Sequence, residues 1–135
     1  MKSLFVVVSL LTVLWWPWSS GKKYRMTADA SVPAASGTVQ AQKDKANGNT
    51  NMDIKVNNLA DPTRLTPSEN VYIVWVRPNG GAPVKEGAIG VNNNLKGELN
   101  VVTTSKDFDV FVTAEQSESV ILPSGVEVLR AHVSS

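Results

Sequence analysis

The side chains that most often perform catalysis are scarce in this sequence of 135 residues. It contains no cysteine and one histidine, His132. A Ser-His-Asp triad would have to use that imidazole, and zinc or copper sites need several His or Cys ligands. We therefore predict that the protein is not an enzyme, that it uses no cofactor, and that His132 lies on the surface of the last strand.

Four carboxylates lie close together in the sequence: Asp107, Asp109, Glu115 and Glu118. Oxygen atoms are the ligands that Ca²⁺ takes, yet the Asp-rich loop with a closing Glu that forms an EF-hand is missing. No pair of carboxylates stands out as the facing acids of a glycosidase. We interpret the four as solvated charges on and after one strand, with a cation site as the alternative.

The charge balance argues against one class of partner. Lys and Arg number 13 and Asp and Glu number 12, so the chain lacks the basic surplus of a nucleic-acid-binding domain. We predict no nucleic-acid partner. The absence of cysteine also excludes disulfides, so packing and strand pairing must supply the stability.

The N-terminus predicts export. Lys2 precedes a run of 13 mainly apolar residues, 4–16, which fits the apolar part of a signal peptide, about 7 to 15 residues, better than a membrane span of about 20. Residues 1–20 are therefore expected to be a signal peptide or an N-terminal anchor helix, with a buried core segment as the alternative. Trp18 stands where a lipoprotein would carry its lipid-bearing Cys. The expected location is periplasmic, membrane-anchored or extracellular, with membrane contact only through this segment.

The remaining sequence alternates with a period of two. Residues 21–36 read as a linker or an edge strand, and residues 37–135 as one domain. The alternating apolar positions are Val39, Ala41, Met52, Ile54, Val56, Leu95, Leu99 and Val101. Such alternation places one face of a strand in a core and the other in water.

Two segments, 71–76 and 108–114, are apolar on both faces and predict central strands, and 126–133 predicts the last strand. Turn residues separate the strands at 47–49, 77–81, 92–94 and 123–125. The expected fold is an all-β, antiparallel, immunoglobulin-like β-sandwich of about seven strands.

The order of several short motifs resembles the extracytoplasmic C-terminal domain of the anti-sigma-K factor family. The motifs are an aromatic-x-x-Trp strand with Tyr72 and Trp75, a Gly/Pro turn at 80–84, a Gly-led strand at 87–89, a strand that ends in Val-Thr-x-Glu at 112–115, and a Pro-x-Gly turn at 123–125. The likeness covers residues 71–133. It implies the fold and an envelope location. The family's sigma-binding domain and membrane helix have no counterpart here, so we expect a stand-alone relative without sigma binding.

Tyr72 and Trp75 are three positions apart and must point to opposite faces of one strand. We predict that Trp75 is the central core aromatic and that its indole N–H bonds a backbone carbonyl. Tyr72 would then lie on an exposed or inter-sheet face. Arg77 shares the side of Trp75 and would pack over it, and Asn79 lies in the following turn. Tyr72, Arg77 and Asn79 are the candidate partner contacts.

These features favour a cell-envelope domain that acts by binding or regulating an unknown envelope protein. The alternative is a structural or surface protein that assembles with its own copies through edge strands. A hydrolase or metal-dependent enzyme is the third class.

Overall fold

The computed structural model describes residues 21–134, so the predicted signal peptide or anchor at 1–20 lies outside the described residues. The described part is all-β, as predicted, and its only helix is a short 3-10 turn, η1 (Pro62–Arg64). The strands are β1 (Lys22–Ala28), β2 (Ser36–Lys43), β3 (Thr50–Asn57), β4 (Val71–Pro78), β5 (Val84–Ile89), β6 (Gly97–Thr103), β7 (Asp107–Glu115) and β8 (Glu127–Ser134). Eight strands replace the predicted seven.

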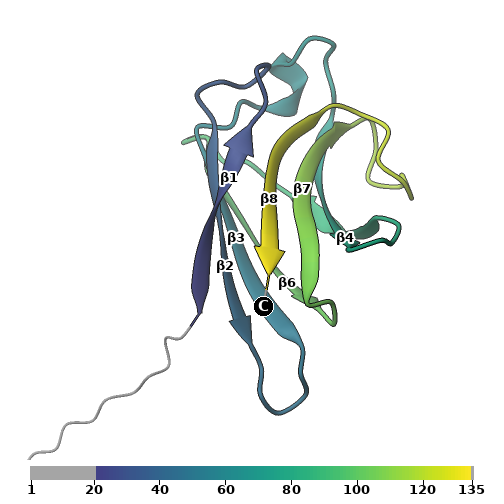
Figure 1. Ribbon diagram of the computed structural model, residues 1–135. Helices are drawn as coiled ribbons and strands as arrows, with labels where there is room; N and C mark the ends of the chain where they lie inside the picture. Colours follow the sequence, from purple (N-terminus) through teal and green to yellow (C-terminus); the bar gives the residue numbers. More distant parts are fainter. Residues whose placement is uncertain (1–20, 135) are drawn as a thin grey trace, which may run out of the picture.

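The strands form one antiparallel sheet in the order β5-β4-β7-β8-β1-β2-β3-β6, which curls until it is nearly closed into a barrel (Figure 1). The predicted sandwich of two separate sheets is not confirmed. The physical reason is β1, whose residues 22–26 pair with β2 while Thr27 and Ala28 pair with β8. Within the segment 21–36, expected as a linker or an edge strand, residues 22–28 therefore form an interior strand that joins the two halves.

The main core lies between the inner faces of the curled sheet. On β3, Met52, Ile54 and Val56 are buried while Asn51 and Lys55 are exposed, which confirms the predicted alternation. Apolar area removed from water stabilises such a core by about 25 cal/mol per Å².

Leu95, expected on the core face of a strand, is an exception. It lies in the turn before β6 with φ of 61° and is 39% exposed. The amide N–H of Leu95 bonds the carbonyl of Asn92, and the turn prediction for 92–94 is thus confirmed. At the β2–β3 turn, Gly48 adopts φ of 76°, a value that favours glycine.

β4 and β7 are central strands, as predicted, because β4 lies between β5 and β7, and β7 lies between β4 and β8. Their outer faces are also buried. Ile73, Trp75 and Phe111 form a second cluster, separate from the main core, against which Val120 packs. Val120 belongs to the segment 116–126, which connects β7 to β8.

Candidate functional site

The structure separates the three predicted partner contacts. Tyr72 faces the main core inside the barrel and is 1% exposed, so it does not lie on an exposed face. Its hydroxyl donates a hydrogen bond to the carbonyl of Ala60 at 2.6 Å. Burial, with the charge of Asp61 adding to it, raises the pKa of Tyr72 to about 12. Tyr72 therefore offers no exposed side chain to a partner.

Arg77 and Asn79 do lie together at the surface. They line a shallow hollow of about 270 Å³ at the end of β4, with Asp109 and His132 on the other side. The Arg77 guanidinium donates to Asp109 Oδ2 at 3.0 Å. Arg77 is therefore already engaged in an ion pair within the chain.

Asp109 is the centre of a charged group on the outer face of β4, β7 and β8. Its Oδ2 also accepts from Arg130 at 2.9 Å, and its Oδ1 lies 2.9 Å from His132 Nδ1. Hydrogen bonding to His132, then the Arg77 bond and the two guanidinium charges, hold the pKa of Asp109 below its usual value against the opposing effect of burial. Arg130 stacks over the Phe111 ring, 5.0 Å from its centroid. Arg77 and His132 lie directly opposite Asp109 on the neighbouring strands, and Arg130 lies opposite Phe111. We assign the group a structural role.

The four carboxylates considered as a cation site do not converge. Asp107 and Glu115 stand at opposite ends of β7, about 26 Å apart at about 3.3 Å per residue. Asp109 binds the groups described above, and Glu115 is buried among hydrogen-bond donors. Within residues 21–134, no three His, Asp or Glu side chains come close enough together to hold a metal ion. His132, with a side chain 61% exposed, occupies the predicted surface position on β8.

A feature that the sequence did not indicate is the seam between β5 and β6, the two ends of the sheet. No strand among residues 21–134 pairs with the free edge of either. Inward-facing side chains are exposed there: Val84 is 51% exposed, whereas Val76, its directly opposed neighbour on β4, is 1% exposed. Leu99 of β6 is half-buried, whereas its opposed neighbour Ile54 is fully buried. The barrel wall is therefore incomplete along this seam.

The seam is closed at one end. The backbone of Gly97 lies so close to the carbonyl of Gly90 that no side chain would fit there. Further along, a Cβ atom at Gly87 would meet the Leu99 side chain at 3.7 Å, and Gly87 itself has φ of 149°. The exposed Val84 marks the other, open end.

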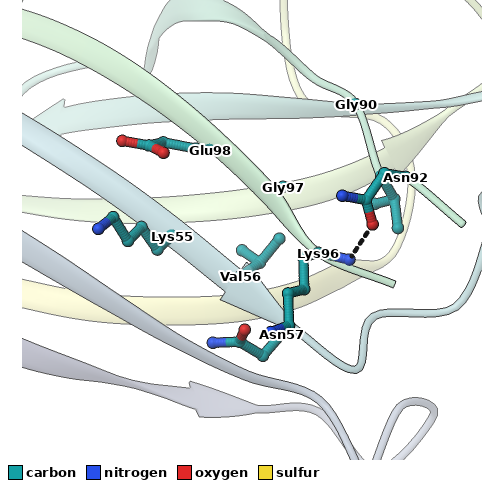
Figure 2. A pocket seen from close by; sticks show the side chains of 9 residues that line it. Lys55, Val56, Asn57, Gly90, Asn92, Lys96, Gly97 and Glu98 are labelled. Atoms are coloured by element: carbon teal, nitrogen blue, oxygen red, sulfur yellow. Dashed lines mark hydrogen bonds between the residues drawn. The ribbon is translucent and has the colours of Figure 1, made fainter. Parts of the chain in front are cut away.

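Beside the closed end of the seam lies a hollow of about 660 Å³ (Figure 2). Lys55, Val56, Asn57, Gly90, Val91, Asn92, Lys96, Gly97 and Glu98 line it. Figure 2 shows the Asn92 carboxamide oxygen bound to the backbone N–H of Lys96, which fixes the loop that forms one wall. Lys55 on β3 lies directly opposite Glu98 on β6. Hydrogen bonding to Asp53 and the negative charge of Asp53 raise the pKa of Glu98. The hollow thus presents ammonium, carboxylate and amide groups.

The described residues contain no helix long and apolar enough to cross a membrane. A scan against models of known protein families finds no match to the sequence, and a search of curated proteins finds none.

Proposed function

We propose that the domain is a non-enzymatic binding module that takes an extended segment of a partner protein at the β5–β6 seam. The observation that carries the proposal is the exposure of Val84, which points inward and is 51% exposed while its opposed neighbour Val76 is 1% exposed. A segment that covered Val84 would complete the wall of the barrel.

Strand addition to a sheet edge explains how such a segment would bind. The free main-chain N–H and C=O groups of an edge strand supply hydrogen bonds, and alternate side chains of the added strand enter neighbouring pockets. Here, an inward side chain of the segment would cover Val84 at the open end of the seam, beyond the point where β5 meets Leu99. Outward side chains would lie beside Val102 on the outer face of β6.

The two edges differ in how well they are protected. β5 is short and irregular, with a register shift opposite Val74 and Trp75. β6 pairs with β3 without interruption over seven residues and carries Val102, 57% exposed, on its outer face near its C-terminal end. Bulges and charges are the usual protection of edges, so β6 is the strand that would receive the segment.

The cell-envelope setting and a regulatory role belong to the same proposal. They are supported by the export signal predicted at residues 1–20 and by the resemblance to the anti-sigma-K sensor domain. The partner would be an envelope protein with an exposed strand of alternating apolar residues.

The exposed Val102 on an unprotected edge favours one alternative, self-assembly, in which β6 of a second copy takes the place of the partner strand. Light scattering during size-exclusion chromatography distinguishes the two. A monomer at millimolar concentration would eliminate self-assembly and leave the binding function in place.

The test uses a peptide of seven alternating Thr and Val residues as the probe, with binding followed by NMR. We expect shift changes confined to residues 84–89 and 97–103. Val84→Lys would weaken binding about tenfold, because a charge would meet the apolar face of the added strand. Val126→Lys, a control at a similarly exposed valine outside the seam, would leave it unchanged. Shift changes elsewhere, or equal binding by Val84→Lys, would overturn the proposal.

A further inference from the structure

A second hollow, of about 200 Å³, opens at the end of the barrel where β1 and β3 begin and where β2 and β8 end. Its inner surface comes from the core: Ala41, Thr50 and Val133 are buried, and Tyr24 is half-buried. The Tyr24 hydroxyl donates to the carbonyl of Ser134 at 2.6 Å, which fixes the ring against the end of β8. The hollow shares no lining residue with the seam.

Three lysines from three separate elements surround the opening: Lys22 from the start of β1, Lys43 from the end of β2, and Lys106 just before β7. All three are exposed. None of the nine described residues that line the hollow is acidic, and within residues 21–134 none of these lysines forms an ion pair.

The acidic residues adjacent to two of the lysines in sequence are Asp44 and Asp107. The Asp44 carboxylate accepts the backbone N–H of Ala46 in the β2–β3 turn. Asp107 is exposed at the start of β7. Neither lines the hollow, so no described residue within it balances the positive charges at its opening.

From this arrangement we propose that the hollow binds an anionic group carried on an apolar tail, with the anion among the three ammonium groups and the start of the tail against Ala41, Tyr24 and Val133. The mouths of β-barrels are a recurrent place for such sites. The volume is below the range of about 300 to 1,000 Å³ typical of ligand pockets, so the ligand enters with its head group and its first few methylene groups. The source of such a group is a free amphiphile or the head of an anionic lipid.

The experiment measures binding of octanoate to the full chain by isothermal titration calorimetry, with acetate and octanol as probes that lack the tail and the charge. We expect octanoate to bind more tightly than either. Lys43→Gln combined with Lys106→Gln would weaken octanoate binding about five- to tenfold. Lys55→Gln combined with Lys96→Gln, a matched pair at the other hollow, would have no effect.

Vesicles with and without phosphatidylglycerol identify the source. If the variant with both Lys43→Gln and Lys106→Gln also loses the extra vesicle binding caused by the anionic lipid, the lipid head group is the source. If that variant loses only octanoate binding, the source is a free amphiphile. The proposal is overturned if octanol or acetate binds as tightly as octanoate, or if the two pairs of lysine variants behave alike. The peptide test at the seam is independent of each of these outcomes.

Discussion

On the inner face of β4, Tyr72, Val74 and Val76 pack against the other strands of the barrel, whereas on its outer face Ile73 and Trp75 lie beneath a connecting segment. The inner residues are buried because the sheet curls around them. The outer residues are buried with the help of Val120, from the segment 116–126 that lies on the β4 side of the barrel in Figure 1. One strand thus shows two ways of removing apolar surface from water.

The outer arrangement depends on a buried carboxylate. Glu115 accepts hydrogen bonds from the backbone N–H groups of Ser124 and Gly125 and from the hydroxyl groups of Ser124 and Thr113. Thr113 in turn accepts the indole N–H of Trp75 at 2.8 Å. A single chain of bonds therefore joins Trp75 to the segment that covers it. The inner face has only the single hydrogen bond from Tyr72 to the carbonyl of Ala60. This difference can be tested by removing the bonding groups one at a time.

The largest effect is expected from Trp75→Ala. The side chain is fully buried, and truncation of a buried aromatic costs about 3 to 5 kcal/mol of unfolding free energy. Urea unfolding followed by circular dichroism gives the value. Leu122→Ala, at a 57% exposed position in the same segment, is the control and should stay within about 0.5 kcal/mol of the parent. A loss below about 1 kcal/mol for Trp75→Ala would mean that the outer cluster is loosely packed and contributes little to stability.

Glu115→Gln should have the next largest effect, about 2 kcal/mol at neutral pH, because charge-assisted hydrogen bonds to buried donors are lost. Burial acts to raise the pKa of Glu115, but the bonds from Ser124, Thr113 and Gly125 outweigh it and hold the pKa below the usual 4.5. The stabilisation is therefore present above pH 4.5 and is lost as the pH falls through the lower folded value.

Urea unfolding across the acid range checks the sign. The difference between the parent and Glu115→Gln should shrink as the pH falls, while the part of the acid dependence due to Asp109 remains in both. Glu118→Gln, at an exposed position in the segment, should follow the parent at every pH. A difference that stays constant with pH would show that the charge of Glu115 is not what holds the segment.

The sequence predicts part of the difference between the two faces of β4. The period of two correctly placed Tyr72 and Trp75 on opposite faces, and the doubly apolar runs correctly predicted that β4 and β7 are central. It could not tell which face of β4 points into the barrel, because both faces are apolar. Trp75, expected in the centre of the main core with a backbone carbonyl as partner, lies in the outer cluster and bonds the Thr113 hydroxyl instead.

The candidate sites depend on strand order, which local patterns do not determine. The seam exists because β5 and β6 end the sheet, and the sheet is continuous because Thr27 and Ala28 pair with Leu129 and Arg130, about a hundred residues along the chain. Strands so far apart in the sequence pair only as the whole domain folds, so no local stretch of sequence predicts which strands pair. The same pairing brings Lys22 and Lys106 to one opening, although the chain as a whole is almost neutral.

The smallest effect is expected on the inner face, from Tyr72→Phe. Loss of the hydroxyl removes one hydrogen bond to the carbonyl of Ala60 and should cost about 1 kcal/mol at neutral pH. Since the folded pKa of about 12 exceeds the usual 10, the parent should lose stability as the pH rises between these two values, and Tyr72→Phe should lose less. Tyr24→Phe, whose hydroxyl bonds a carbonyl at the exposed end of the barrel, is the matched control. If Tyr72→Phe costs more than Glu115→Gln, the inner face also depends on a buried polar bond, and the contrast between the two faces of β4 disappears.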